Sequence, residues 1–422
     1  MTTLQIINLA IMLAFFLCYS YQFFYIPVAW FKKDAPHREP SPHRIAVLIA
    51  ARNEQSVIGN LIDSVKAQDY PTELVDVFVV ADNCTDLTGS VAGAHGANVY
   101  FRNDQTQVGK GYALQYLLHC IEEDFAPYDG YLVLDADNVL SPDYITEINK
   151  TFSDGYQIVT SYRNSKNYDS NWISAGYAVW FLREAKFLNN ARMMVGTSCA
   201  ISGSGWMVSE KIVRGMHGWD FHTLTEDIQF STFCCAHNIQ IGFAPAEFFD
   251  EQPLTFKASW TQRMRWTKGF YQVFFSYNRD LLKGIRKGQF ASYDMLMTIA
   301  PGMILTLLSF FVNAVYLIVG SLSHGFIATE GELSMCVGSL IMTFASMYVV
   351  FFLLAVITTI SERKHIHAKK KWRIFTNLFT FPIFMMTYIP ITAAALFKKV
   401  EWVPTKHDIA VNFDEVMSEG AK

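Results

Sequence analysis

Four long stretches of this chain lack charged side chains. Residues 1–31, 295–329, 333–360 and 374–397 contain no Asp, Glu, Lys or Arg. Each exceeds the roughly 20 apolar residues that cross a bilayer as a helix. The pattern predicts an N-terminal transmembrane anchor over 1–31 and transmembrane helices within 289–397. The last stretch contains Pro382 and Pro390, which favour either a single crossing or a re-entrant path.

Between these stretches, short apolar runs alternate with helical patterns. Residues 44–51, 74–81, 97–101 and 131–134 are apolar and rich in strand-forming side chains. Residues 57–65 and 109–120 place apolar side chains at helical spacing. This alternation predicts an α/β domain over 42–255, with a parallel sheet covered on both faces. Ligands of such sheets bind beyond the carboxyl ends of the strands.

Two amphipathic segments predict helices at the membrane interface. Residues 256–288 predict an interface helix that immediately precedes the membrane region. Residues 172–189 predict a second interfacial helix, in which Trp172, Trp180 and Arg183 lie at the lipid boundary. Lys and Arg follow the anchor and flank the later stretches, which places the central domain in the cytosol by the positive-inside rule.

The C-terminal tail, residues 398–422, has two interpretations. Lys398 and Lys399 favour a cytosolic tail. Trp402, Pro404 and His407 could then approach the active site as a gating segment. The alternative is a disordered tail with an interfacial Trp.

Composition narrows the class of protein. The chain is 51% hydrophobic and 17% charged, whereas a soluble domain has about 25% charged residues. A net charge of −4 argues against nucleic acid as a partner. The seven cysteines are scattered without zinc spacing, as expected for free thiols in a reducing cytosol.

Acidic and basic side chains gather at the predicted strand ends. Asp135 and Asp137 follow the run 131–134, and alternate residues project to one side, which suits Mg²⁺ or Mn²⁺ together with phosphate oxygens. Acids at strand ends are also common caps and turn formers. Asp82 lies where a base or ribose would meet the sheet, or else forms an Asx turn. Lys110 could reach a phosphate, or be a solvated lysine at a helix start.

A second acidic pair precedes the helical pattern 228–237. Thr225 is a candidate N-cap, and carboxylates at a helix start are stabilised by the helix dipole. The functional interpretation makes Asp227, with Glu226 beside it, the general base for an acceptor hydroxyl that attacks an anomeric carbon. Direct displacement inverts configuration, so an α-linked donor would give a β-linked product.

The interface segment contains Gln262-Arg263-Met264-Arg265-Trp266. Arg suits a diphosphate, and Trp suits a sugar ring that stacks on it. The alternative is a membrane-surface helix with an interfacial Trp and a snorkelling Arg, for which Arg263 is the candidate.

Seven short elements stand in a fixed order between residues 44 and 275. They are Ala51-Arg52-Asn53-Glu54, Asp82, Gly109-Lys110-Gly111, Asp135-Ala136-Asp137, Ser202-Gly203-Ser204-Gly205-Trp206, Thr225-Glu226-Asp227 and Gln262-Arg263-Met264-Arg265-Trp266. With the flanking membrane pattern, they resemble membrane-integrated family 2 glycosyltransferases. That group contains hyaluronan, cellulose and poly-N-acetylglucosamine synthases.

The resemblance implies a GT-A (Rossmann-like) fold and a set of roles. The implied UDP-sugar site consists of Ala51, Arg52, Glu54, Asp82, Lys110, Asp135, Gln262 and Arg265. The implied ligands of Mg²⁺ or Mn²⁺ are Asp137 and Asp135, and the catalytic pair is Asp227 and Glu226. The implied acceptor site consists of Trp266, Gly203 and Ser204.

Three functions fit these features. The first is a processive β-polysaccharide synthase of the plasma membrane, because the Gln-x-x-Arg-Trp element is associated in that family with chain extension. The second is a glycolipid synthase that adds one or two sugars, because four spans make a thin wall for the export channel of a polysaccharide synthase. A polysaccharide synthase with so few spans would need a homodimer or an accessory subunit for export. The third, a catalytically silent scaffold, is disfavoured because every acid that the chemistry requires is present.

Overall fold

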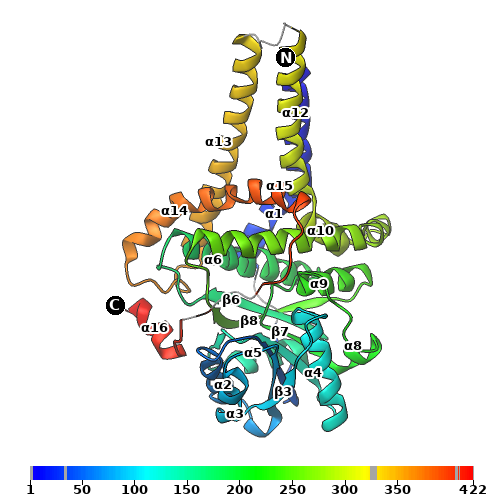
Figure 1. The fold of residues 1–422 in the computed structure, drawn as a ribbon, viewed down its shortest axis with the longest axis vertical. Coiled ribbons are helices and arrows are strands. Elements are labelled where there is room, and N and C mark those ends of the chain that lie inside the picture. Colours follow the sequence, from blue (N-terminus) through cyan, green and yellow to red (C-terminus); the bar gives the residue numbers. More distant parts are fainter. Residues whose placement is uncertain (1–2, 33–35, 324–329, 404–406, 408, 422) are drawn as a thin grey trace.

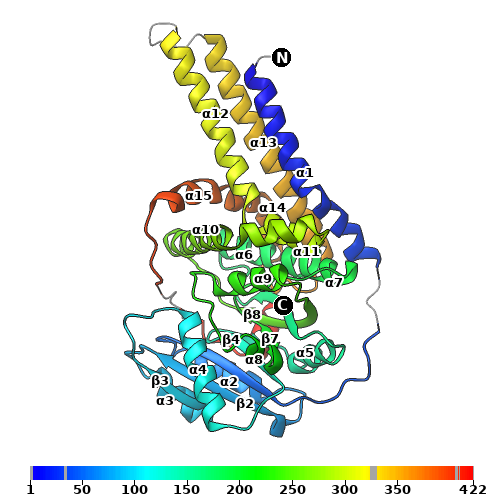
Figure 2. The same ribbon diagram turned by 90° about the vertical axis from the view of Figure 1, so that its right-hand side faces the viewer.

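An α/β body supports a group of long helices that rise from one side of it (Figure 1). The computed structural model describes residues 3–32, 36–323, 330–403, 407 and 409–421. Figure 2 shows the α/β body at one end and the upright helices α1 (Thr3–Phe31), α12 (Pro301–Ser323) and α13 (Glu330–Ser361) at the other. Further helices form a layer between them, so the body meets the upright helices through this layer.

One eight-stranded sheet, in the order β3-β2-β1-β4-β7-β6-β8-β5, forms the centre of the body. Strands β3, β2, β1 and β4 are parallel, as the strand-helix alternation predicts. Beyond them the sheet is mixed: β7 is antiparallel to β4 and β6, β6 is parallel to β8, and β5 is antiparallel to β8. The strands are β1 (Ile45–Ala51), β2 (Val75–Asp82), β3 (Asn98–Arg102), β4 (Gly130–Asp135), β5 (Val139–Leu140), β6 (Ile158–Ser165), β7 (Trp206–Ser209) and β8 (Ile241–Asp250).

Helices cover both faces of the sheet, and alternation along each strand decides which face a side chain meets. On β1, Ile45, Val47 and Ile49 join the core on one face, and Ala46 and Leu48 join the core on the other. This two-residue period is that of a strand buried on both faces. The first face packs on α2 (Ile58–Lys66), α3 (Thr88–Ala94) and α5 (Tyr144–Ser153), and the second on α4 (Lys110–Asp124) and α9 (Glu226–Ala236). The short helices η1 (Thr72–Leu74) and α8 (Glu210–Gly215) lie in connections.

The layer below the upright helices contains α6 (Trp172–Arg183), which continues through a π-helical turn (Glu184–Asn190) into α7 (Ala191–Val195). It also contains α10 (Phe256–Arg286), within the range predicted for an interface helix, and α11 (Phe290–Ile299). The interfacial setting predicted for 172–189 is wrong, because most of α6 is buried, including Arg183. Helix α14 (Lys371–Met386) covers it, and a side chain at Gly176 would collide with the Phe384 ring.

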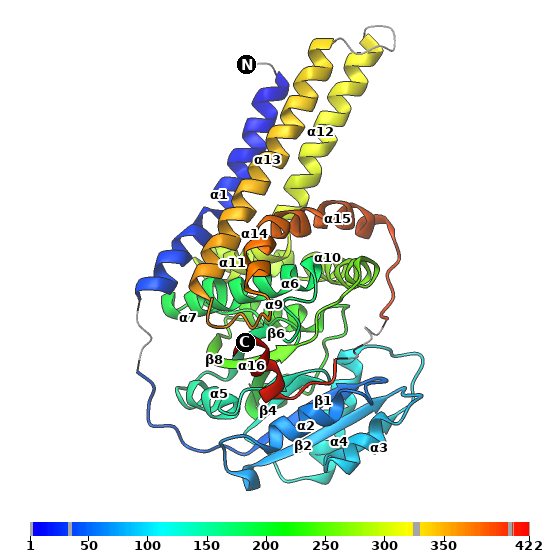
Figure 3. The ribbon, with the colours of Figure 1, turned by 90° about the vertical axis from the view of Figure 1, so that its left-hand side faces the viewer.

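Within the described parts of the chain, three helical segments are long and apolar enough to cross a membrane: Thr3–Phe31, Leu333–Ser361 and Lys371–Phe397. A fourth results if α11 and α12, which are bent by 49°, form one span. Helices α1, α12 and α13 rise in the same direction (Figure 3). Helices α14 and α15 (Tyr388–Phe397) instead lie across their base, on α6 and α10. In the 18-residue apolar stretch of this segment 39% of the residues are buried, against 6% in each of the other two. The stretch 374–397 is therefore apolar enough to cross but runs crosswise in this structure.

Candidate active site

The carboxyl ends of three parallel strands bring the first predicted residues to one edge of the sheet. In the strand register, Ala50 pairs with Asp135 and Ala51 pairs with Ala81. Asp82 and Asp135 therefore lie on opposite sides of β1, at the end where ligands of such sheets bind.

A half-buried network joins Asp135 to the glycine-rich segment 202–206. Lys110 Nζ donates to Asp135 Oδ1 (2.6 Å) and to the carbonyl of Gly203 (2.9 Å). Ser204 Oγ accepts the backbone N–H of Asp135 at 2.8 Å. Burial would raise the pKa of Asp135, but the Lys110 charge outweighs burial and lowers it. The Asp135 carboxylate is therefore ionised and engaged by a lysine.

The position of Lys110 depends on the glycines around it. Gly109 has φ +141°, in the region that favours glycine, and it precedes the first turn of α4. A Cβ on Gly111 would lie 1.9 Å from the carbonyl oxygen of Phe221. These two glycines let α4 begin against the segment ahead of α9, which brings Lys110 between Asp135 and Gly203.

Two acids in the first turn of α9 meet the same network. Asp227 Oδ2 accepts the backbone N–H of Gly203 at 2.6 Å. Burial and then the charge of Asp227 raise the pKa of Glu226 to about 7. Thr225 occupies the N-cap position, but its side chain makes no cap bond and packs against Gly269 of α10. A carboxyl group that titrates near neutral pH therefore lies next to Asp227.

Asp137 belongs to a second group of acids on the same edge. Its Oδ2 accepts the backbone N–H of Glu251, just after β8, at 2.9 Å. Glu54 is 8% exposed and bonds His407 Nδ1 at 3.0 Å. Burial raises the pKa of Glu54. Burial lowers the pKa of His407, but Asp137 and Glu54 outweigh it and raise the value to about 10. An imidazolium thus lies among the acids.

This acid group suits a cation that is bound partly by protein carboxylates and partly by phosphate oxygens. Among the described residues, no three His, Cys, Asp or Glu side chains form a complete metal site. Mg²⁺ in nucleotide sites uses one or two carboxylates and completes its shell with phosphate oxygens and water. Asp137 supplies a buried carboxylate, and Glu54 and Glu251 add negative charge around it. The donor set present here is of that type.

The C-terminal tail lies against this group of acids. The backbone N–H of Ile409 donates to Glu251 Oε2 at 2.8 Å. Ser56 Oγ donates to the carbonyl of His407 at 3.1 Å. These bonds place the tail over the segment that follows β1, next to the acid group.

The rest of the tail adds contacts on either side. The Arg52 guanidinium lies 5.3 Å from the centre of the Trp402 ring. Helix α16 (Phe413–Ala421) follows, and Phe413 packs on Phe249 of β8. Trp402 thus lies beside the site, like His407, whereas Pro404 is outside the described residues.

Asp82 is held by an arginine rather than by the Asx turn that the sequence left open. Arg102 NH1 donates to Asp82 Oδ1 at 2.7 Å, and both side chains are 6% exposed. Asn83 Nδ2 donates to the same oxygen at 3.1 Å. The carboxylate is therefore fixed in orientation at the sheet edge.

Helix α10 brings the end of the segment 262–266 next to the site. Arg265 NH1 donates to the carbonyl of Leu224 at 3.2 Å, just ahead of α9. The Trp266 ring packs edge-on against Tyr177 (5.7 Å between centroids) and Phe181 (6.3 Å) of α6. Trp266 is half-buried, so one part of the ring remains accessible.

Arg263 is not the snorkelling arginine that the sequence suggested. It is fully buried, and its NH1 donates to the Phe384 carbonyl (3.2 Å) and to Thr387 Oγ1 (2.6 Å). These partners lie where α14 gives way to α15, so Arg263 ties that break to α10. The neighbouring Gln262 has a buried Oε1 without a hydrogen-bond partner among the described residues.

Sequence reasoning missed Glu251 of the acid group and also Arg163, Lys166 and Asp250. Arg163 Nε donates to Asp250 Oδ2 at 2.7 Å, and its NH1 donates to the Ser202 carbonyl at 3.0 Å. Burial lowers the pKa of Lys166, which faces Asp137. Asp250 follows an apolar run, the same signal that singled out Asp135. No signal distinguished the two basic residues.

These features define an α/β domain with an acidic sheet edge and a carboxylate pair, joined to helices long and apolar enough to cross a membrane. The family model described as glycosyltransferase-like family 2 matches residues 42–269, just over half of the chain. The chain belongs to this family.

Known proteins resemble the chain in sequence and in fold. A beta-monoglucosyldiacylglycerol synthase of Nostoc sp. is 27% identical over 269 residues, 60% of this chain and 54% of that protein. A poly-beta-1,6-N-acetyl-D-glucosamine synthase of Staphylococcus epidermidis is 23% identical over 257 residues, 60% of each chain. The chain spans about half the length of the first of these.

A solved structure supports the predicted GT-A fold. The mannosyltransferase PcManGT of Pyrobaculum calidifontis, in complex with GDP-Man and Mn²⁺, matches with a TM-score of 0.58. The match covers 92% of this chain and 99% of that chain, at 16% sequence identity. The body is therefore a GT-A domain, as the resemblance implied.

Proposed function

We propose that this chain is an inverting, divalent-metal-dependent glycosyltransferase that uses a UDP-sugar. The observation that supports this most strongly is the half-buried network through Lys110, Asp135, Gly203 and Asp227. It links the strand end that faces the donor to the acid that faces the acceptor, so one bound sugar could meet both.

The donor lies along the carboxyl edge of the sheet in this proposal. Mg²⁺ or Mn²⁺, held by Asp137 with Asp135 nearby, would neutralise charge on the departing diphosphate. Lys166, whose positive charge is buried beside Asp137, and Arg265 add positive charge on this side. The nucleoside end rests on Ala51, Arg52, Glu54 and Asp82, with Gln262 toward the diphosphate.

The acceptor hydroxyl approaches from the side of α9. Asp227, oriented by the Gly203 N–H, takes the hydroxyl proton as the oxygen bonds to the anomeric carbon. The bond to the diphosphate breaks with its electron pair, so an α-linked donor gives a β-linked product. Ser204 and the accessible part of Trp266 line the acceptor side.

The acceptor is a lipid-linked hydroxyl in this proposal. The spans Thr3–Phe31 and Leu333–Ser361 have few buried side chains, so a single chain has little wall for a polymer channel. Helix α10, which contains Trp266, also borders an apolar hollow of about 320 Å³ with Tyr271, Leu308 and Leu396 in its lining. A synthase whose name specifies a glycosyldiacylglycerol product is among the relatives.

A chain-extending β-glycan synthase is the second candidate. It is favoured by the Gln262-Arg263-Met264-Arg265-Trp266 element, whose Trp266 adjoins the site, and by the poly-N-acetylglucosamine synthase relative. In this case a homodimer or an accessory subunit would complete a channel. In both candidates the protein is a multi-pass membrane protein with its catalytic domain on the cytosolic face of the plasma membrane.

The test is to incubate membranes that contain the full chain with radiolabelled UDP-sugars and to size the products. Asp227→Asn membranes, prepared in parallel, show which label depends on this site. One discrete, solvent-extractable glycolipid supports the first candidate, and a ladder or high polymer supports the second. Absence of both product and UDP release, with every donor, would refute both.

A further inference from the structure

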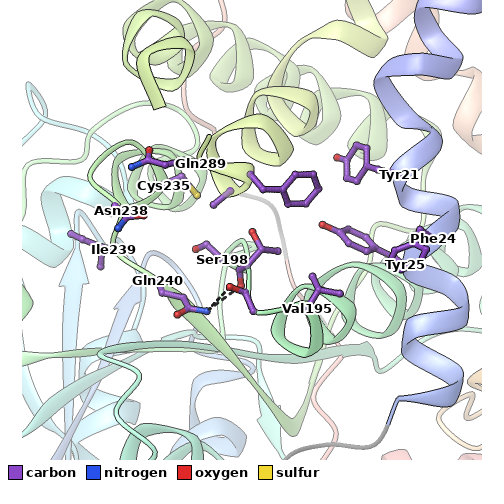
Figure 4. Close-up of a pocket in the computed structure, with 14 residues that line it drawn as sticks. Tyr21, Phe24, Tyr25, Val195, Ser198, Cys235, Asn238, Ile239, Gln240 and Gln289 are labelled. Atoms are coloured by element: carbon purple, nitrogen blue, oxygen red, sulfur yellow. Dashed lines mark hydrogen bonds between the residues drawn. The ribbon is translucent and has the colours of Figure 1, made fainter. Parts of the chain in front are cut away.

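A separate cavity of about 510 Å³ lies where α1 meets the α/β body (Figure 4). Its walls come from α1, from segment 195–198, from residues 235–240 at and beyond the end of α9, and from the start of α11. None of the proposed active-site residues lines it. Its volume falls within the roughly 300–1,000 Å³ of small-molecule sites.

The cavity lies at the level where lipid heads are expected. Helix α1 has 29 residues, and about 20 of them cross the hydrocarbon core. The final third, with Phe24 and Tyr25 on the cavity wall, then lies in the headgroup region, where tyrosines concentrate, and Tyr21 lies just before it. Phe24 is 64% exposed, and Phe290 across the cavity is 43% exposed. Apolar side chains thus flank the cavity on the lipid side.

The lining is polar but uncharged. Figure 4 shows Ser198, Asn238, Gln240 and Gln289 around the cavity, and no Asp, Glu, Lys, Arg or His is among the described lining residues. A lipid head that meets these side chains would therefore find amide and hydroxyl groups but no charge to pair with.

Two cations near the cavity are already engaged. Arg192 forms a two-pronged ion pair with Asp294 at 2.7 Å for both bonds. Lys32 Nζ donates to the carbonyl of Met194, next to the lining segment. A phosphate would therefore find no cation in the cavity walls.

Some polar groups in the cavity wall have no hydrogen-bond partner or only long hydrogen bonds. Thr197 lines the cavity and is 8% exposed, and its Oγ1 has no hydrogen-bond partner within the described parts of the chain. Gln240 Nε2 makes long bonds to the carbonyls of Gly196 (3.3 Å) and Thr197 (3.4 Å). A ligand that supplies a hydroxyl would satisfy such groups, whose burial without partners is unfavourable.

We propose that this cavity binds an uncharged lipid with a hydroxyl-bearing head, such as a diacylglycerol, whose acyl chains leave past Phe24 along α1. This site is distinct from the acceptor position. Cys235, on the cavity wall, lies eight residues along α9 from Asp227, a rise of about 12 Å. The inference therefore does not depend on the acceptor being a lipid.

The test uses the full chain in phosphatidylcholine nanodiscs that contain a photoactivatable diacylglycerol. Labelling is expected on peptides from the end of α1, from 195–198 or from 235–240. Thr197→Val, which keeps the shape and removes the hydroxyl, should lower apparent affinity about fivefold, the effect of one hydrogen bond. Ala291→Phe should fill the cavity and abolish this labelling. Ala345→Phe, exposed on α13, is the matched control.

Competition decides the chemistry of the ligand. Unlabelled diacylglycerol should displace the probe, and phosphatidylglycerol should not. Equal displacement by phosphatidylglycerol, labelling confined to the apolar hollow at Tyr271, or unchanged labelling in both cavity variants would each overturn the proposal. If Ala291→Phe lowers the unfolding temperature, the isosteric Thr197→Val variant still gives the answer.

Discussion

Glu226→Gln removes a carboxylate that the fold holds at a pKa of about 7, against an ordinary value of 4.5. Because the folded pKa is the higher one, the folded protein binds this proton more tightly than the unfolded chain. Its contribution to stability is full below pH 4.5 and is lost as pH rises through about 7. The shift corresponds to about 3 kcal/mol at pH 8. The variant should therefore gain up to that amount at pH 8.

Thermal unfolding of the purified protein between pH 4.5 and pH 8 measures this effect. A gain of about 3 kcal/mol corresponds to roughly 6–12 °C for a domain of this size, and it should shrink steadily toward pH 4.5. Glu122→Gln, an exposed Glu on α4, is the control and should show no such trend. A gain independent of pH, or a loss at pH 8, would refute the reasoning.

The same proton should appear in catalysis. As pH falls through about 7, Glu226 takes up a proton and the negative charge beside the base Asp227 is lost, so the site attracts the acceptor proton less strongly. The wild-type kcat/KM should therefore decline below about pH 7. In Glu226→Gln, this decline should move to lower pH, and an unmoved decline would assign it to another group.

Three further substitutions test the donor site, the acceptor site and the packing of α4 against the segment ahead of α9. Asp137→Asn should weaken Mn²⁺-dependent UDP binding at least about tenfold by calorimetry; unchanged Mn²⁺ dependence would count against the metal role. Trp266→Ala should reduce sugar transfer more than donor hydrolysis, and equal losses would contradict a sugar platform. Gly111→Ala should cost about 1–3 kcal/mol, because the new Cβ meets the Phe221 carbonyl. Gly93→Ala, whose Cβ would lie 3.8 Å from Val99, is the control, and equal stability of the two would exclude the clash.

Sequence predicted the half of the sheet in which strands follow one another with helices between. Parallel strands share a direction, so acids that follow them meet at one edge, as Asp82 and Asp135 do. The mixed half was not predicted, since β7 has four residues and its neighbours in the sheet are distant in sequence. Arg163 of β6 and Asp250 of β8 meet because these two strands pair in the mixed half of the sheet. No local sequence pattern identifies a partner that lies so far away along the chain.

The helical layer shows a second limit of local pattern. Helix α6 is apolar on nearly all sides, which is typical of a buried helix, yet its Trp and Arg residues suggested a lipid boundary. What covers α6 is α14, about 200 residues later, through the contact of Gly176 with Phe384. Arg263 was misplaced for the same reason, because its partner Thr387 is 124 residues away.

Asp227→Asn, measured for sugar transfer and for UDP-sugar affinity in the same preparation, tests the shared site most directly. The carboxamide keeps the side-chain shape beside the Gly203 N–H but cannot accept the acceptor proton. Transfer should fall by at least about a hundredfold, while donor affinity stays within about twofold. Transfer that survives at a substantial fraction of wild type would contradict the assignment of Asp227 as the base.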